Sequence, residues 1–259
     1  MQVNEPARSE LLGLPFDPST MQAAVDQCLG WCEAPRCPHT VITANAAILC
    51  MMRRDPALKD ACTKGDLIVA DGASVVWVSR LAGVRLPVRV AGVDLMDNLL
   101  RTGAARGLSV YFLGARPEVV KGLVDRCARD YPGLKIAGYQ DGYFKPGEQA
   151  AVIEHIRTSA PHMLFVGMPS PFKETFCEQN RDRLGVPVIM GVGGSFDVLA
   201  GWVRRAPRRL QLMGLEWAWR LLMEPRKLWK RYLTTNGEFL WLAGKEILAL
   251  RLRPPGRAA

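Results

Sequence analysis

The chain has 259 residues, enough for one large α/β domain or for a domain of about 200 residues with an appendage. Although 49% of the residues are hydrophobic, no apolar run approaches the roughly 18 to 20 residues that cross a bilayer, and the first residues lack the apolar core of a signal peptide, so we expect a cytoplasmic protein. Seven scattered cysteines favour reduced thiols over a disulfide framework, and the net charge of +9 suggests an anionic partner.

The first forty residues predict a strand and a helix. Residues 10–17 could form an edge strand of the sheet, with Pro15 limiting its pairing, before a helix that Ser19 or Thr20 would cap. Four residues that could bind zinc follow: Cys28, Cys32, Cys37 and His39. Because no paired Cys-x-x-Cys motif accompanies them, we interpret these cysteines as buried thiols rather than as metal ligands.

Residues 41–45 form a short β-branched run, and a helix-like apolar stretch follows it. Thr43 and Asn45 alternate along this strand, so both side chains would point to one side of its end. They could line a binding site, or they could satisfy the local backbone. Asp55-Pro56 then predicts the start of another helix.

The most informative stretch is Asp66 to Trp77. Its apolar run ends at Ala70, meets Asp71-Gly72 and continues into a helical pattern, which is typical of a buried parallel strand that passes into a helix. Ligands of open α/β sheets bind at the carboxyl ends of strands, so Asp71 would lie at the mouth of an active cleft. The alternative is a turn or N-cap carboxylate that binds only the free N–H groups of the helix.

After a connection over residues 86–92, Asp94 is the expected N-cap of the next helix. A strand over residues 109–114 ends at Gly114, and Pro117 begins another helix, so free N–H groups at this junction could bind an anion. The junction matches neither the dinucleotide motif Gly-x-Gly-x-x-Gly nor a P-loop, so neither of those phosphate sites is supported.

Further strands alternate with helices as far as residue 191. The expected strands are residues 134–138, 162–167 and 186–191, and the expected helices are residues 117–130, 147–159 and 171–183. This alternation is typical of right-handed βαβ crossovers. We therefore predict an α/β core over residues 1–200, with a Rossmann-like, mainly parallel sheet and flanking helices.

Two loops that follow these strands are candidates for ligand contact. Residues 167–174 include Lys173, and residues 191–197 end at Asp197. Three glycines at the second strand end would let the backbone approach a nucleotide closely, although they could also serve packing alone. These glycines are Gly191, Gly193 and Gly194.

Residues 201–259 differ sharply in composition from the preceding part of the chain. They hold 13 Lys/Arg and 4 Asp/Glu, whereas residues 1–200 hold 21 Lys/Arg and 21 Asp/Glu, so the whole net charge of +9 lies in residues 201–259. Five of the seven tryptophans lie there too. We predict a basic helical appendage that Pro225 divides, with Arg220, Lys227 and Lys230 on a cationic face. It could dock on anionic lipid, or it could be a solvated helix pair packed on the core through its tryptophans.

Several sequence blocks, taken in order, give the chain a specific resemblance. They are Thr43-Ala44-Asn45, Ala70-Asp71-Gly72, Arg89 to Leu95, Gly191 to Asp197, and Arg205-Ala206-Pro207 through Glu224-Pro225-Arg226. From about Pro15 to Tyr232 the chain resembles the WecG/TagA/CpsF family of bacterial glycosyltransferases. The resemblance implies transfer of a sugar from a UDP-sugar to a polyprenyl-diphosphate-linked saccharide, with inversion at the anomeric carbon, on the inner face of the cell membrane.

The resemblance also implies residue roles in the core. Asp71 matches the family's proposed general base, and Thr43, Asn45 and Arg89 match residues that line the pocket. Many members have glutamine where Lys173 stands. Because lysine has a charge that glutamine lacks, contacts with the donor could differ here.

In the appendage, the resemblance implies that cationic side chains close over the cleft. Their matches are Arg220, Lys227 and Lys230. Arginines are usual at the last two positions, and a lysine keeps the charge but loses the planar fork that grips a diphosphate.

The departing UDP gathers negative charge, which enzymes neutralise with a metal or with fixed cations. No Asp-x-Asp motif occurs in the chain, so we expect no metal and no cofactor, with Arg89 and the appendage cations as the counter-charge. The predicted catalytic residues are Asp71, Arg89 and Arg220. The predicted substrate-binding residues are Thr43, Asn45, Asp94, Gly114, Lys173, Gly191, Gly193, Gly194, Asp197, Lys227 and Lys230.

Two other classes of function are alternatives, a basic nucleic-acid-binding protein and a non-catalytic membrane scaffold. The neutral core and the lack of a recognition motif disfavour nucleic acid as a partner. The donor sugar is left open among N-acetylmannosamine, its uronic acid and glucose. A homo-oligomer is possible.

Overall fold

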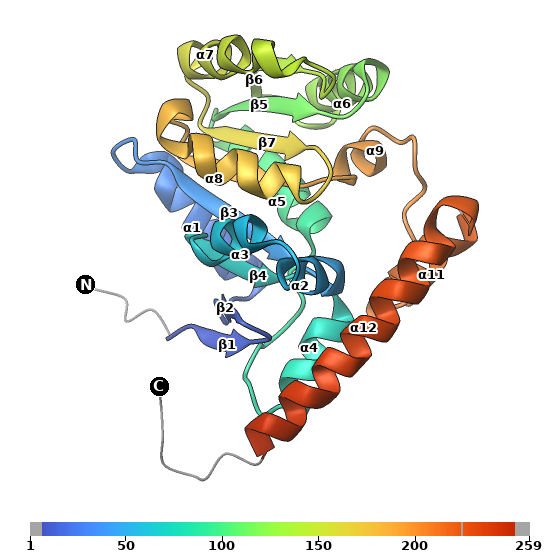
Figure 1. The fold of residues 1–259 in the computed structure, drawn as a ribbon. Helices are drawn as coiled ribbons and strands as arrows, with labels where there is room; N and C mark the ends of the chain where they lie inside the picture. The colour runs from blue at the N-terminus through green and yellow to red at the C-terminus, as the bar shows by residue number, and fades with distance from the viewer. Residues whose placement is uncertain (1–6, 224, 252–259) are drawn as a thin grey trace.

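The computed structural model describes residues 7–223 and 225–251 and has an α/β architecture (Figure 1). Its main sheet contains six parallel strands in the order β4-β3-β8-β7-β5-β6. These strands are β3 (His39–Ala44), β4 (Leu67–Ala70), β5 (Ser109–Gly114), β6 (Lys135–Gln140), β7 (Met163–Gly167) and β8 (Val188–Gly191). The predicted mainly parallel sheet is therefore confirmed.

Helices cover both faces of this sheet, because side chains alternate between the faces along each strand. Val110 and Phe112 of β5 pack into one buried cluster, while Tyr111 and Leu113 pack into another. The first face carries α1 (Met21–Glu33), α5 (Gly92–Ala105), α6 (Pro117–Asp130) and α9 (Ser195–Leu199). The second carries α2 (Ala46–Met52), α3 (Pro56–Thr63), α7 (Gln149–Ser159), which follows the short 3-10 helix η1 (Pro146–Glu148), and α8 (Phe172–Leu184).

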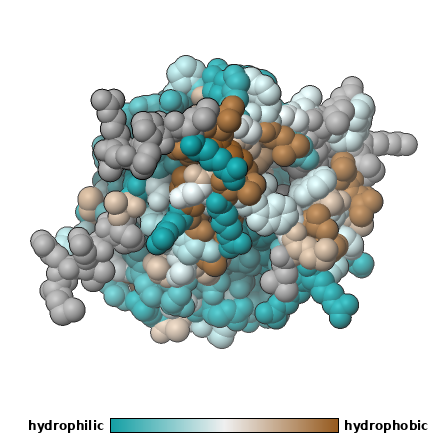
Figure 2. Space-filling model, turned by 90° about the horizontal axis from the view of Figure 1, so that it is seen from below, coloured by the Kyte–Doolittle hydropathy of each residue, from teal (hydrophilic) through white to brown (hydrophobic). Residues whose placement is uncertain are grey.

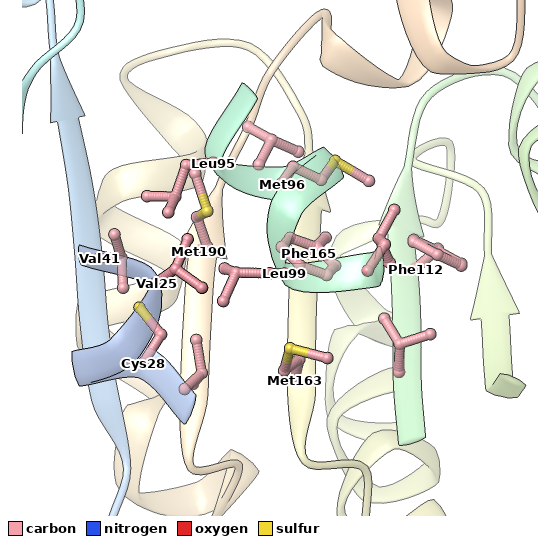
Figure 3. Close-up of a cluster of buried hydrophobic side chains, with 14 of the residues drawn as sticks. Val25, Cys28, Val41, Leu95, Met96, Leu99, Phe112, Met163, Phe165 and Met190 are labelled. Carbon is pink, nitrogen blue, oxygen red and sulfur yellow. The ribbon is translucent and has the colours of Figure 1, made fainter. Parts of the chain in front are cut away.

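The start of α5 is fixed at the sheet by apolar packing. Leu95, Met96 and Leu99 are fully buried and face the sheet residues Phe165 and Met190 (Figure 3). Burying a leucine side chain contributes about 1.5–3 kcal/mol. The N-terminus of α5 is therefore held rigidly at the edge of the sheet where the strands end.

The N-terminal segment differs from the prediction. Residues 10–17 do not form an edge strand of the main sheet, since β1 (Ser9–Leu11) and β2 (Leu14–Phe16) make a separate antiparallel hairpin. Leu12 and Gly13 form its turn with φ of 54° and 77°. A turn with two positive φ angles reverses the chain tightly, so the segment pairs with itself.

The C-terminal segment is helical, as predicted, and consists of α10 (Arg208–Leu212), α11 (Glu216–Met223) and α12 (Pro225–Arg251). Pro225 begins the last of these helices. α12 lies along α2 and α4 (Ala73–Leu81) (Figure 1). Its residues Phe239, Leu242 and Ala243 are buried in the same cluster as α2.

Polar contacts also join α12 to the core. Arg54, which follows α2, forms an ion pair with Glu238 at 2.8 Å, and the N–H of Leu12 donates to Glu246 at 3.4 Å. Trp229 and Trp241 remain half exposed. The helix therefore packs on the core through Phe239 and its buried neighbours, whereas these two tryptophans face outward.

Candidate active site

The carboxyl ends of three neighbouring strands bring several predicted site residues together. Strands β4, β3 and β8 are adjacent and parallel, so they end at the same edge of the sheet. Asp71 follows β4, Asn45 follows β3, Thr43 lies near the end of β3, and Gly191 ends β8. Segments that are distant in the sequence thus converge on one rim.

Asp71 is partly buried at this rim, beside the start of α5. Gly72 is the N-cap of α4, so Asp71 is not the N-cap of that helix. A Cβ atom on Gly92 would lie 3.0 Å from Thr43 Oγ1 and 3.5 Å from Asp71 Oδ2. The hydroxyl and the carboxylate therefore meet at the first residue of α5, where the helix dipole stabilises negative charge. The sequence reasoning overlooked Gly92, whose lack of a side chain permits this approach.

Thr43 and Asn45 differ in how their side chains are used. Thr43 is buried and lines a small cavity together with Gly191. The Asn45 Oδ1 atom accepts hydrogen bonds from the N–H groups of Ala47 and Ile48 at 3.0 and 3.2 Å. Asn45 thus caps α2, and its amide nitrogen is the group left for a ligand.

Asp94 lies in the first turn of α5, but the predicted N-cap role was wrong. The helix begins at Gly92 and Ala91 is its N-cap. The two carboxylate oxygens of Asp94 instead contact the two terminal nitrogens of the Arg205 guanidinium, at 2.6 and 2.7 Å. Such a bidentate pair fixes the geometry as well as the charge.

This ion pair belongs to a network of four charged side chains. Glu216 is the first residue of α11, and its carboxylate accepts hydrogen bonds from Arg89 Nη2 at 2.7 Å and from Arg205 Nε at 3.4 Å. All four side chains are partly buried, with 18% to 34% exposed. The network is neutral, and it ties the appendage to α5 and to the connection that holds Arg89. In the sequence, Arg205 and Glu216 lie in the blocks that carry the family resemblance, but no ion pair between them and the core was predicted.

Lys173 is the second residue of α8 and lies next to the end of β8. Its aliphatic stem packs on Gly191, where an added Cβ would approach Lys173 Cδ to 3.2 Å. Lys173 Nζ donates to Ser170 Oγ at 2.6 Å and forms an ion pair with Glu174. Glu174, which the sequence reasoning missed, is only 3% exposed.

The other glycines of the prediction have different surroundings. A Cβ on Gly114 would lie 2.6 Å from the backbone of Gly167, and its φ is 122°, so close packing and backbone conformation both explain this glycine. Gly114 ends β5, three strand positions from β3, which is about 14 Å at the usual strand spacing of ~4.8 Å. Gly114 therefore lies at the same carboxyl edge of the sheet as Asp71 but well apart from it, and its part in substrate binding stays a prediction.

In the loop after β8, Gly193 has φ of 50°. A Cβ atom on Gly193 would lie 3.7 Å from Lys173 Cε. Gly194 faces open space and is the N-cap of α9. Asp197 lies in the first turn of that helix, and its carbonyl accepts a hydrogen bond from the N–H of Val203. Of these three residues, Gly193 is the one that contacts a predicted site side chain.

The predicted appendage cations cannot be placed in the same way. Arg220 belongs to α11, and Lys227 and Lys230 belong to α12. Their side chains lie outside the described residues. Their contribution to the site stays a prediction.

One thiol, that of Cys177, lines the same small cavity as Thr43 and Gly191. Six of the seven cysteines are buried and Cys37 is exposed. Burial raises the pKa of Cys32 to about 12, so its thiol stays protonated at neutral pH. Within residues 7–223 and 225–251, no three His, Cys, Asp or Glu side chains are grouped as a metal site would need.

Comparisons with known proteins agree on one type of enzyme. The model of the glycosyl transferase WecG/TagA/CpsF family matches residues 9–253. A relative from Bacillus spizizenii is 39% identical over 194 residues, which cover 75% of this chain and 74% of the relative. A relative from Bacillus subtilis is 36% identical over 194 residues, with 75% of each chain covered. Both relatives are named N-acetylglucosaminyldiphosphoundecaprenol N-acetyl-β-D-mannosaminyltransferase.

Proposed function

The chain belongs to the glycosyl transferase WecG/TagA/CpsF family, and we propose that it transfers a sugar from a UDP-sugar to a polyprenyl-diphosphate-linked saccharide. The names of the two relatives favour N-acetylmannosamine as the sugar and a diphosphate-linked N-acetylglucosamine as the acceptor. The observation that carries the proposal is the approach of Asp71 and Thr43 to Gly92 at the rim of the sheet. A nucleic-acid-binding protein or a membrane scaffold would not account for this arrangement.

In the proposed reaction Asp71 is the general base. The acceptor hydroxyl oxygen forms a bond to the anomeric carbon while the bond from that carbon to the phosphate oxygen breaks. The hydroxyl proton passes to the Asp71 carboxylate, and the electron pair of the broken bond leaves with UDP. A single displacement of this kind inverts the anomeric carbon. General-base catalysis typically contributes about 10²–10⁴-fold to the rate.

Arg89 is proposed to neutralise the departing diphosphate. Its guanidinium contacts Glu216 at 2.7 Å, and its side chain is 18% exposed. The N–H of the next residue, Val90, donates to the carbonyl of Ala70 at the end of β4, so Arg89 lies near the rim and is held there by an acid from the appendage. A diphosphate carries more charge than one carboxylate and accepts the same fork-shaped set of hydrogen bonds. Arg220, Lys227 and Lys230 are proposed to add charge from the appendage.

We expect the purified protein to transfer N-acetylmannosamine from its UDP form to a lipid-diphosphate-linked N-acetylglucosamine acceptor. Mass spectrometry of the product, with UDP-glucose and a UDP-uronic acid as parallel donors, checks this result. Because fixed cations supply the counter-charge, EDTA should leave the rate within about twofold. If EDTA abolished transfer and manganese restored it, metal-independent transfer would be wrong. If no donor gave a product, the proposed function would be wrong.

We also propose that the outward face of α12 docks on anionic lipid. Leu240, Trp241 and Leu248 are 53% to 70% exposed, and Lys245 Nζ lies 3.9 Å from the centre of the Trp241 ring. Seen from below, hydrophobic side chains gather in patches between hydrophilic ones (Figure 2). Apolar and cationic side chains together suit a membrane interface. None of the described helices is both long and apolar enough to cross a bilayer.

Leu240→Glu combined with Leu248→Glu is expected to lower binding to vesicles that contain anionic lipid by at least about tenfold. Each leucine contributes about 1.5–3 kcal/mol when it enters an apolar environment. Tyr143, which is 72% exposed in the segment after β6, provides the matched control as Tyr143→Glu. Vesicle sedimentation measures the bound fraction. Equal binding by both variants and the unmodified protein would contradict docking through α12.

A further inference from the structure

A buried pair of opposite charges lies at the start of α8. Lys173 is 7% exposed and Glu174 is 3% exposed. Charged side chains are almost never this buried unless they are paired. The pair is close to the proposed active site, because the Lys173 stem packs on Gly191 and Gly193 at the end of β8.

The hydrogen bonds of this pair are unevenly distributed. Glu174 Oε1 accepts from Lys173 Nζ and from Ser170 Oγ, the latter at 2.8 Å. Glu174 Oε2 is buried and has no hydrogen-bond partner among the described residues. A buried acceptor without a partner costs about 1–3 kcal/mol or more, since it has lost its water. Lys173 uses two of its three N–H donors, on Ser170 Oγ and Glu174 Oε1.

Glu174 lies on the face of the sheet that α8 covers and borders the proposed active site. It lines the same small cavity as Thr43 and Gly191. Thr43 in turn approaches the first residue of α5 beside Asp71. A group bound at the rim of β3 and β8 can therefore extend toward the Lys173–Glu174 pair.

The charge of the pair limits what it can bind. Lys173 and Glu174 are only 7% and 3% exposed, against 18% and 22% for Arg89 and Glu216, so the buried pair cannot exchange partners as readily and offers no net positive charge to a diphosphate or a uronate. An anionic group would also meet the buried Oε2 atom, which repels it. A neutral group that donates a hydrogen bond fits better, because it satisfies the unpartnered acceptor.

We propose that Glu174 recognises a neutral N–H or O–H donor on the sugar of the UDP-sugar, with Lys173 holding the carboxylate in place and donating its third N–H. An acetamido group satisfies both residues, since its N–H donates to Oε2 and its carbonyl accepts from Lys173. A sugar hydroxyl satisfies Oε2 equally but is smaller. This inference rests on the proposed function and adds to it a residue that determines donor specificity.

The test compares three ligands on the unmodified protein and on Glu174→Gln. Calorimetry with UDP, UDP-N-acetylmannosamine and UDP-glucose gives the three dissociation constants. In Glu174→Gln the amide oxygen can still accept from Lys173, but an N–H₂ group replaces the free acceptor. We expect the variant to bind UDP within about twofold of the unmodified protein. It should bind the N-acetylated donor about 10–100-fold more weakly, as loss of a hydrogen bond to a charged group predicts.

The two donors distinguish the recognised groups. Weakening of the N-acetylated donor alone identifies the acetamido N–H as the partner, and equal weakening of both donors identifies a hydroxyl. Weakening of UDP itself to the same extent would overturn the inference, because UDP lacks the hexose that is transferred. Unchanged binding of all three ligands would overturn it as well.

A second variant protects this test from misfolding. Lys173→Gln keeps a side-chain N–H that can donate to Glu174 Oε1, but it removes the ammonium that is proposed to donate to the acetamido carbonyl, so it should weaken the N-acetylated donor more than UDP. A folded Lys173→Gln protein, judged by its thermal unfolding, that binds the N-acetylated donor and UDP as tightly as the unmodified protein does would contradict the inference. Failure of the unmodified protein to bind any UDP-sugar would instead contradict the proposed function.

Discussion

Arg89→Gln is expected to lower kcat for sugar transfer by about 10²–10³-fold. Removing one preorganised donor that stabilises developing negative charge has an effect of this size. Arg89 is suited to that role because its side chain is 18% exposed and its guanidinium is positioned by a 2.7 Å contact with Glu216. Glutamine retains hydrogen-bonding capacity but loses the positive charge. Steady-state kinetics with a saturating UDP-sugar measure the change.

Glu216→Gln is the matched control, because it removes the acid from the same ion pair. If Arg89 acts on the diphosphate, this variant leaves Arg89 charged, and kcat should fall by less than about tenfold. If the ion pair is only structural, Glu216→Gln should lose at least as much activity and free energy of unfolding as Arg89→Gln, since Glu216 contacts both Arg89 and Arg205. A loss of activity in Glu216→Gln as large as that in Arg89→Gln would therefore contradict a role for Arg89 in catalysis.

The network also explains why the appendage cannot simply be removed in a test. Glu216 contacts both Arg89 and Arg205 across the boundary at residue 201. Phe239 and Leu242 are buried against the core, and deleting a buried Phe side chain alone typically costs about 3–5 kcal/mol. A chain truncated after Ala200 would thus lose stability together with any catalytic contribution, and point variants separate the two effects.

The sheet could be predicted from the sequence because its signals are local. Each strand is a short apolar run, and turn residues or helical periods follow it, as at Ala70 and Asp71. The parallel order then follows from the alternation of strands and helices. Thr20 could be named as a cap for the same reason, and its Oγ1 accepts from the N–H of Ala23.

The errors arose where local signals compete or where partners are distant. Asp94 is a good N-cap residue, but Arg205, 111 positions away, binds its carboxylate in the first turn of α5. The hairpin at Leu12 and Gly13 depends on positive φ angles that a leucine rarely adopts.

Glu174 was overlooked for a related reason. A glutamate next to a lysine on a helix suggests a solvated surface, and only the fold shows that both are buried. The position of Asp71 was predictable from the strand that precedes it. Its proximity to Gly92 was not, because the two residues belong to separate segments.

Asp71→Asn is expected to reduce transfer by about 10²–10⁴-fold, which is the usual contribution of a general base. Asparagine has nearly the same shape, so the backbone contact of Asp71 with Ala44 at 2.8 Å should remain. The amide cannot take the proton of the acceptor hydroxyl. Binding of the UDP-sugar should therefore stay within about threefold of the unmodified protein.

The most direct test of the proposed mechanism measures transfer and donor binding on the same preparation of Asp71→Asn. Product is quantified by mass spectrometry with the lipid-linked acceptor, and UDP-sugar binding is measured by calorimetry. A folded variant that binds the donor normally but forms at least a hundredfold less product is the predicted result. Transfer within about threefold of the unmodified rate would contradict Asp71 as the base.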